Sequence, residues 1–185
     1  MLRLFAGFFT TRRLQEVLET IRSQSNHHLR GKWVEPENLH LTFQFFGEVE
    51  SSRVVELLKN LQEVSSNVKP IKVKYIGLGV FPSVDRARVL WIGIGDGYKA
   101  LKDLTKQLVK VNKKSGFDDG SKIFHPHVTI CRINSYDKAF LQELLNTYEN
   151  RYFGEDVVDK IALIKSSLNP IGPVYSVLEE FSLGR

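Results

Sequence analysis

The feature that most constrains the fold of this chain is an internal repeat of about 87 residues, which occupies almost all of its 185 positions. The repeat is marked by a four-residue pattern that occurs twice, at residues 40–43 (HLTF) and 127–130 (HVTI). The two histidines are 127 − 40 = 87 residues apart. Two copies of one unit predict two similar lobes packed about a pseudo-twofold axis.

The segments on either side of the two patterns repeat in the same order. In the first unit, strand-like, helical, helical and β-rich patterns follow one another, at residues 3–8, 11–23, 54–61 and 71–78. In the second unit, the same patterns lie at residues 89–94, 101–111, 140–145 and 157–164. An apolar stretch at about 174–183 lies beyond the second unit and predicts a final strand that completes a sheet.

This organisation predicts an α+β fold in a single bilobal domain over residues 1–185. We expect repeat 1 at about 1–85, repeat 2 at about 86–172, and two pseudo-symmetric lobes that arise from the duplication. Each lobe is expected to be a mainly antiparallel sheet with helices on its outer face. The lobes are expected to flank a central cleft, in which the pseudo-twofold axis brings the two His-x-Thr strands face to face.

Each His-x-Thr pattern predicts a strand with one polar and one apolar face. Side chains at i and i+2 share a face, so His40 and Thr42 lie together, and the same holds for His127 and Thr129. Because imidazole titrates near neutral pH, two converging imidazoles can supply one proton acceptor and one proton donor. A lone histidine on a strand is more often a hydrogen-bonded structural residue. The equivalent positions in the repeat are what favour the chemical interpretation here.

If a phosphodiester lies between the two strands, the Thr42 and Thr129 hydroxyls can hydrogen-bond its non-bridging oxygens, and no metal is required. Arg132, five residues after His127, is the candidate for a guanidinium that stabilises negative charge. Strand alternation directs Arg132 away from the His127 face, unless a twist or a bulge redirects it.

The composition is that of an ordinary globular chain, with 42% hydrophobic and 25% charged residues. No run approaches the roughly 18 apolar residues that span a bilayer. The apolar residues 1–9 are too few for a signal peptide and lack a cleavage site. We therefore expect a cytoplasmic protein without a membrane partner.

Charge and cysteine content narrow the candidate partners. The net charge of +5 favours an anionic partner, although most surface lysines are simply solvated. The single cysteine, Cys131, excludes an internal disulfide and a cysteine metal cluster, and is predicted to be a small packed residue. His125 and His127 form a His-x-His pair that could bind a metal, but Pro126 separates them and a third ligand is not evident. We predict that His125 is a rim residue.

Several motifs together resemble a known family. The segments 39–43 with 46–49 (FGEV), and 124–132, resemble the two signature segments of the 2H phosphoesterase superfamily. With residues 3–5 (RLF), 89–91 (VLW) and 172–175 (GPVY), the chain resembles more narrowly the RNA 2′,3′-cyclic phosphodiesterases, historically called 2′-5′ RNA ligases. The resemblance covers essentially the full length.

The resemblance implies two α+β lobes that flank a cleft, and hydrolysis of a 2′,3′-cyclic phosphate at an RNA end to a 2′-phosphate, with no metal or cofactor. By position, His40 would be the proton donor to the departing 3′ oxygen and His127 the acceptor that activates water. Thr42 and Thr129 would grip the phosphate, with Arg132 assisting. The implied partner is RNA with a cyclic phosphate end, and tRNA fragments are one candidate.

Two other functions remain open from the residues alone. A 2′-5′ end-joining ligase would use the same residues, and an RNA-end-binding protein could keep the cleft without significant turnover. We expect a monomer, because the duplication already forms the twofold site. Aromatic residues near the cleft could stack on bases, but we predict that Phe8, Phe9, Phe43 and Trp91 are core residues.

Overall fold

A computed structural model describes residues 1–117, 124–169 and 172–184 of the chain. The strands are β1 Leu2–Phe9, β2 Leu29–Trp33, β3 His40–Val49, β4 Ile71–Phe81, β5 Val89–Ile94, β6 His127–Tyr136, β7 Tyr152–Val158, β8 Lys160–Leu168 and β9 Pro173–Ser182. The α-helices are α1 Arg12–Ser25, α2 Val54–Ser66, α3 Tyr98–Lys114 and α4 Lys138–Tyr148. Three short 3-10 helices are η1 Pro36–Asn38, η2 Ser51–Arg53 and η3 Val84–Arg86.

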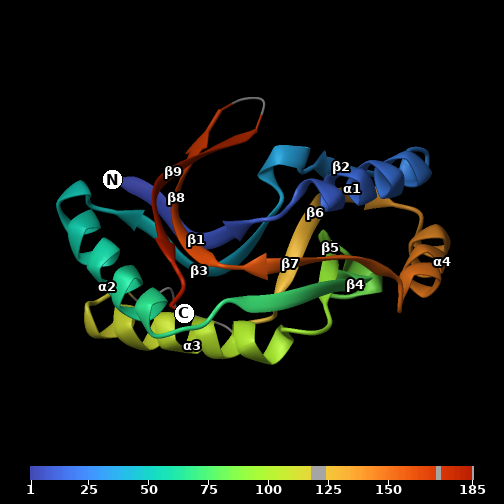
Figure 1. Cartoon of the computed structure of the whole chain (residues 1–185). Coiled ribbons are helices and arrows are strands. Elements are labelled where there is room, and N and C mark those ends of the chain that lie inside the picture. Colours follow the sequence, from blue (N-terminus) through green and yellow to red (C-terminus); the bar gives the residue numbers. More distant parts are fainter. Residues whose placement is uncertain (118–123, 170–171, 185) are drawn as a thin grey trace.

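Within these described residues, the strands form one curled sheet in the order β7-β4-β5-β6-β3-β1-β8-β9, and β2 pairs with β6 (Figure 1). All pairings are antiparallel. The sheet divides between β3 and β6, which are joined through the pair Leu41 and Val128. Helices α2 and α3 pack on the half that contains β3, whereas α1 and α4 pack on the half that contains β6. The predicted α+β fold with two lobes is confirmed.

The two lobes exchange strands between the sequence repeats. β4 belongs to the first repeat but pairs with β5 of the second, and β8 belongs to the second repeat but pairs with β1 of the first. The helices cross in the same way, because α1 follows β1 yet packs on β7, and α3 follows β5 yet packs on β3. Neither repeat can therefore bury its own sheet without the other.

A buried carboxylate also links the two repeats. Asp156 on β7 is only 6% exposed. Its Oδ2 accepts hydrogen bonds from the Tyr75 hydroxyl at 2.8 Å and from the Thr11 backbone N–H at 3.1 Å. Tyr75 and Thr11 come from the first repeat and Asp156 from the second, so the hydrogen bonds that satisfy this buried side chain join the two repeats.

The main hydrophobic core lies between the sheet and the helices. On β1, the residues Leu4, Ala6 and Phe8 face this core, as alternation requires. The intervening Phe5 and Phe9 lie on the other face of the sheet, in a second cluster with residues of β8 and β9. β1 is thus apolar on both faces, which explains its unbroken run of apolar residues.

Two details differ from the sequence-based expectation. The β-rich stretch at 157–164 is two strands, β7 and β8, which are separated at Asp159. Residues 29–33, for which the sequence patterns predicted no strand, form β2. Cys131 is buried and free, as predicted, and burial raises the pKa of its thiol to about 12. In the described ranges, no helix combines the length and the apolar character that crossing a membrane would require.

Candidate active site

The two His-x-Thr patterns meet where β3 and β6 pair. Leu41 lies opposite Val128, and both are fully buried against the helices. Because side chains alternate along a strand, the histidine and threonine of each pattern lie on the opposite face of the sheet, where all four are partly buried. The antiparallel register sets His40 across from Thr129, and Thr42 across from His127. The structure therefore brings together the four residues that the sequence singled out.

Each imidazole makes the same type of hydrogen bond to a backbone carbonyl. Nδ1 of His40 lies 2.6 Å from the carbonyl oxygen of Asn38, and Nδ1 of His127 lies 2.6 Å from the carbonyl oxygen of His125. A carbonyl can only accept, so each Nδ1 carries the hydrogen. Nε2 of each ring is then the nitrogen that can accept or donate a proton in a reaction.

Both rings are disposed to be neutral in the free protein. Burial is the main cause that lowers the pKa of His40 below its ordinary value of 6.5, and the charges of His127 and Arg132 lower it further. Burial also lowers the pKa of His127, with a smaller contribution from His125. In both cases the bond to a backbone carbonyl opposes the shift. An anion bound between the rings would raise both pKa values.

Arg132 reaches this face through a β-bulge. Trp91 on β5 pairs with Thr129, whereas the preceding Leu90 pairs with Cys131, so Ile130 is an extra residue in β6. Ile130 and Cys131 are both buried, which resets the alternation and exposes Arg132 on the side of Thr129. Simple alternation would have directed Arg132 away, and the bulge is the reason that it does not. Its charge acts on His40 and on Tyr175.

The other strand contains the same bulge. Gly7 on β1 pairs with Thr42 and Ala6 pairs with Gln44, so Phe43 is the extra residue in β3. The position equivalent to Arg132 is then Phe45, which is 53% exposed. Sequence reasoning missed Phe45 as a site residue. The repeat offset could have found it, since 132 − 87 = 45.

Aromatic rings surround His40. The ring centroids of Phe5, Tyr175 and Phe9 lie 5.0, 5.1 and 6.1 Å from that of His40. Phe5 and Tyr175 also contact each other at 5.3 Å, edge to face. Burial raises the pKa of the Tyr175 hydroxyl, so this group is a neutral hydrogen-bond donor at neutral pH.

A second aromatic group surrounds His127. The ring centroids of Phe81, Trp91 and His125 lie 5.0, 6.0 and 6.3 Å from that of His127. Trp91 lies flat against Gly79 of β4, where an added Cβ would come within 2.1 Å of the indole. Gly79 therefore allows the close approach that places the indole beside His127.

These ring contacts show that two of the four aromatic residues predicted to lie in the core do not. Phe8 and Phe43 are buried core residues, as predicted, but Phe9 and Trp91 are only partly buried and lie beside the two histidines. Because β1 and β5 are apolar on both faces, their sequences did not show which residues point into the core and which point toward the histidines. His125 is partly buried two residues before β6, where its Nδ1 lies 3.2 Å from the Tyr98 hydroxyl.

No metal-binding group of three or more His, Cys, Asp or Glu side chains occurs among residues 1–117, 124–169 and 172–184. His125 and His127 are near one another, but each Nδ1 has a partner from the protein. Within the described chain, the arrangement brings together two imidazoles, two hydroxyls and a guanidinium, which is a set suited to an anionic ester.

Known proteins share this arrangement of repeats and strands. A family described as LigT like Phosphoesterase matches residues 10–91 and again residues 94–175. An RNA 2′,3′-cyclic phosphodiesterase of Aquifex aeolicus is 50% identical over 100% of this chain and 98% of its own length. One of Methanocaldococcus jannaschii is 33% identical over 97% of this chain and 100% of its own length.

Solved structures agree on the fold. A crystal structure of a Thermus thermophilus protein has a TM-score of 0.80 and 27% identity, and covers 98% of this chain and 97% of its own. Escherichia coli LigT, crystallised with 3′-AMP, has a TM-score of 0.78 and 23% identity, with 100% and 99% covered, and shows the fold alone. The resemblance that the sequence motifs suggested is confirmed, and the chain belongs to the LigT-like phosphoesterases of the 2H superfamily.

Proposed function

We propose that this protein hydrolyses the 2′,3′-cyclic phosphodiester at RNA ends to a 2′-phosphomonoester, by a two-histidine acid/base mechanism that needs no metal. The observation that carries the proposal is the juxtaposition of His40 and His127 across β3 and β6, each with Nδ1 bonded to a backbone carbonyl. The Aquifex aeolicus and Methanocaldococcus jannaschii relatives are named as enzymes of this activity, which supports the same substrate class.

In the proposed reaction, the two imidazoles act on opposite sides of one phosphorus atom. His127 Nε2 accepts a proton from water as its oxygen forms a bond to phosphorus. The bond from phosphorus to the ribose 3′ oxygen breaks, and protonated His40 donates its Nε2 proton to that oxygen. The product is a 2′-phosphate beside a free 3′-hydroxyl. The donor and acceptor assignment follows the family resemblance, because the local geometry of the two rings is nearly the same.

The bound substrate itself prepares the acid. His40 is disposed to be neutral in the free protein, but a phosphodiester anion beside its ring favours the imidazolium form. Thr42 and Thr129 would donate hydrogen bonds to the non-bridging oxygens. Arg132 would stabilise the negative charge that grows on them in the transition state.

The proposal also includes the RNA substrate, the cellular compartment and the oligomeric state. The substrate would be an RNA strand that ends in a cyclic phosphate, with tRNA fragments as one candidate, and the reaction would take place in the cytoplasm. A monomer would suffice, because β3 and β6 of one chain supply both histidines. Light scattering of the purified protein would test the last point.

The test is an incubation with adenosine 2′,3′-cyclic phosphate, in the presence and in the absence of a chelator. We expect adenosine 2′-monophosphate as the product, separated chromatographically from the 3′ isomer, at a rate that the chelator leaves unchanged. Formation of the 3′ isomer would overturn the regiochemistry, and inhibition by the chelator would overturn the metal-free mechanism.

The same assay separates the two alternative functions. An RNA-end-binding protein would bind the nucleotide without converting it. A 2′-5′ ligase would use the 5′-hydroxyl of a second RNA in place of water. The 5′ oxygen would bond to phosphorus, the bond from phosphorus to the 3′ oxygen would break, and the two strands would be joined through a 2′-5′ linkage. Supplying that second RNA at high concentration measures the balance between joined and cleaved ends.

A further inference from the structure

The positive charge of the protein is concentrated in one helix. Helix α3 carries six lysines and one aspartate, so its formal charge is 6 − 1 = +5. The whole chain has 26 − 21 = +5. The remaining residues therefore sum to 20 − 20 = 0. A basic stripe along one helix is the pattern expected of a surface that binds a polyanion.

These lysines follow one face of the helix. At 100° per residue, positions 99, 102, 106 and 110 fall within about 80° of one another, away from the buried positions 101, 104, 105, 108 and 112. Lys99, Lys106 and Lys110 are exposed, and Lys102 is partly buried. We call Lys99, Lys102, Lys106 and Lys110 the lysine face. It is about 16 Å long at 1.5 Å per residue.

The lysine face begins at the candidate active site. Lys102 Nζ lies 5.5 Å from the centroid of the Tyr98 ring, and the Tyr98 hydroxyl lies 3.2 Å from Nδ1 of His125. The charge of Lys102 is close enough to help lower the pKa of His125, after the larger effect of burial. His125 in turn contacts His127, with 6.3 Å between ring centroids. A chain of contacts thus connects the reactive imidazole to the first turns of α3.

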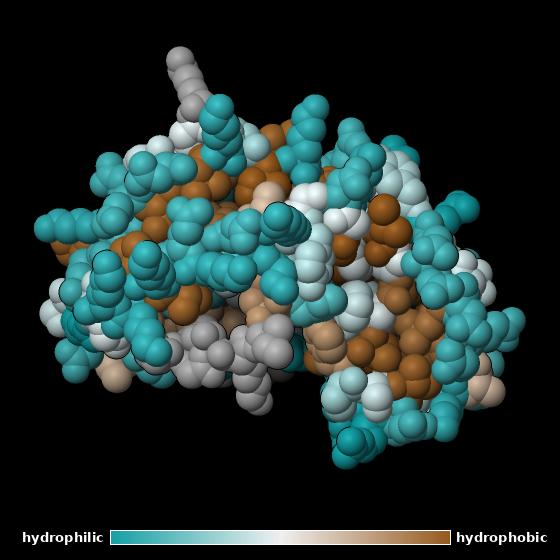
Figure 2. Space-filling view, turned by 90° about the horizontal axis from the view of Figure 1, so that it is seen from below, coloured by the Kyte–Doolittle hydropathy of each residue, from teal (hydrophilic) through white to brown (hydrophobic). Residues whose placement is uncertain are grey.

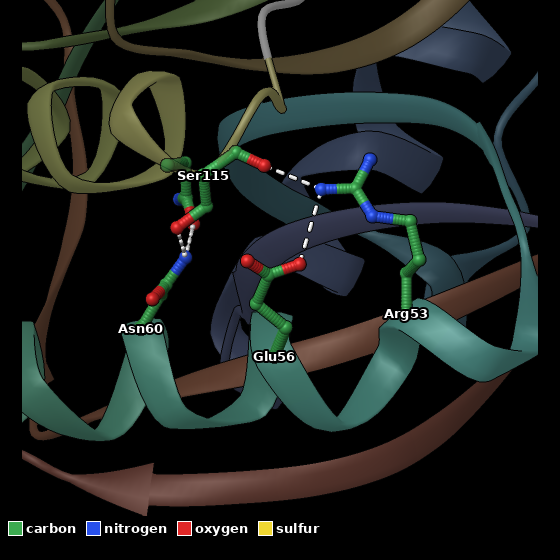
Figure 3. Close-up of polar contacts among 5 residues, drawn as sticks. Arg53, Glu56, Asn60 and Ser115 are labelled. Atoms are coloured by element: carbon green, nitrogen blue, oxygen red, sulfur yellow. Dashed lines mark hydrogen bonds and ion pairs between the residues drawn. The ribbon is translucent and has the colours of Figure 1, made fainter.

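The orientation of the lysine face is fixed by the contacts of the opposite side of α3. Leu101, Leu104 and Leu108 are fully buried. Near the C-terminal end, Asn60 of α2 donates hydrogen bonds to Asn112 and Ser115, and the Arg53 guanidinium donates to the Ser115 carbonyl (Figure 3). Hydrophilic side chains cover much of the molecule as seen from below, the side on which α3 lies (Figure 2).

An open groove runs beside the lysine face. It has a volume of about 490 Å³ and lies between α3 and the segment that leads from α2 into β4. Asp103 and Gln107 line it on the helix, and Lys69 and Lys72 line it on the other side. Two further cations therefore border the same surface, so that the positive field extends beyond the helix.

We propose that the lysine face of α3 binds the phosphate backbone of the RNA strand that leads away from the cyclic phosphate end. This inference rests on the proposed function. A strand whose terminal phosphate lies between the two imidazoles carries further phosphates outward, and Lys102, Lys106 and Lys110 offer them cations along one side of α3. The contacts would favour longer RNA over a mononucleotide without regard to sequence, because phosphates carry no base identity.

The test compares two substrates in the full-length protein, namely adenosine 2′,3′-cyclic phosphate and an oligoadenylate of about ten residues with the same end, a length within the range of known single-strand sites. In the variant Lys106→Ala/Lys110→Ala, we expect kcat/KM for the oligonucleotide to fall on the order of 10-fold at low salt. The slope of log kcat/KM against log salt should become shallower by about 0.7 for each phosphate contact that is lost. Turnover of the mononucleotide should not change.

Three controls make the outcome decisive. Lys106→Arg/Lys110→Arg should restore the length preference, since the charge is kept. Lys138→Ala/Lys160→Ala removes the same charge from α4 and β8 and should leave the preference intact. Fluorescence anisotropy with an oligoadenylate that ends in a plain hydroxyl measures strand binding without any turnover.

The possible failures are distinguishable. If the wild-type protein does not convert the mononucleotide, the proposed function fails, whereas the anisotropy measurement still tests the lysine face. If the mononucleotide is converted but the α3 variant keeps the wild-type length preference and salt slope, the lysine face is overturned. An equal loss in the α4 and β8 control would show that only net charge matters, and would also overturn it.

Discussion

The two halves of the site lie in two segments that match the same family model, residues 10–91 and 94–175, and they are alike in some features and different in others. In each half, a histidine bonds through Nδ1 to a backbone carbonyl two residues earlier, and a β-bulge follows the threonine. These shared features are properties of the backbone. The halves differ in the side chains that the backbone presents, and the difference is greatest at the position after the bulge, which is Phe45 in one half and Arg132 in the other.

That difference makes a site on a nearly symmetric backbone chemically asymmetric. Arg132 contributes a charge that acts on His40, the histidine of the other strand, whereas Phe45 contacts Phe5 with 5.8 Å between ring centroids. One half therefore contributes a cation and the other an apolar surface. The repeat supplies two equivalent imidazoles, and the different neighbours give each imidazole a different electrostatic environment.

The largest effect should come from the histidines. His40→Ala and His127→Ala should each lower kcat for adenosine 2′,3′-cyclic phosphate by about 10² to 10⁴-fold, because each removes a general acid or base. An aryl phosphodiester distinguishes the acid from the base, because its leaving group departs without being protonated. We expect His40→Ala to recover much of its activity on that substrate and His127→Ala to recover none. The reverse pattern would exchange the assigned roles, and circular dichroism would confirm that both variants are folded.

Arg132→Ala should have the next largest effect. Loss of a preorganised cation at a developing oxyanion lowers kcat by about 10² to 10³-fold in comparable sites. Phe45→Ala, at the equivalent position of the other half, should lower kcat/KM by much less, because it removes no charge. Steady-state kinetics on the mononucleotide gives the comparison directly. Equal losses in the two variants would contradict the assignment of charge stabilisation to one half only.

The sequence predicted the elements that the repeat marks and missed those that depend on pairing. The histidine and threonine positions followed from strand alternation alone, and the helical patterns were placed within a few residues. The bulges at Phe43 and Ile130 were not predictable, because an extra residue in a strand leaves no signature when two adjacent apolar residues can both be buried. For that reason alternation misplaced Arg132 and left Phe45 unnoticed.

The same limit applies to the strands. β2, which begins at Leu29, has only five residues with a glycine and two cations among them, and it exists because β6 offers it an edge. Likewise, Phe9 and Trp91 resemble core residues in sequence, since both faces of their strands are apolar. The exchange of β4 and β8 between the lobes is a property of long-range pairing, on which local patterns carry no information.

The threonines should have smaller and similar effects in the two halves. Thr42→Val and Thr129→Val each remove a neutral hydroxyl of nearly unchanged shape, which corresponds to about tenfold in kcat/KM for one hydrogen bond. Serine at either position should retain most of the activity. If kcat/KM fell 10³-fold in one valine variant and did not change in the other, the phosphate would be held by one strand only. The two threonines would then not have equivalent roles.

The smallest expected effect is a shift in pH dependence. His40 must be protonated to act as the acid, so activity falls as the pH rises through its pKa. In the free enzyme that pKa lies below 6.5, and the basic limb of kcat/KM should therefore lie at lower pH than for an ordinary histidine. In the complex, the bound anion raises the pKa, so the limb of kcat should lie at higher pH than that of kcat/KM.

Titration can also distinguish the two halves of the site. Replacing Arg132 by alanine removes a positive charge that disfavours imidazolium at His40, so the pKa of His40 should rise. Phe45→Ala removes no charge and should leave that pKa close to the wild-type value. NMR titration of the free variants measures the ring directly and does not depend on their remaining activity. A pKa of His40 that is unchanged in Arg132→Ala would mean that the guanidinium is too well solvated to act across the strands, which would confine its role to the bound substrate.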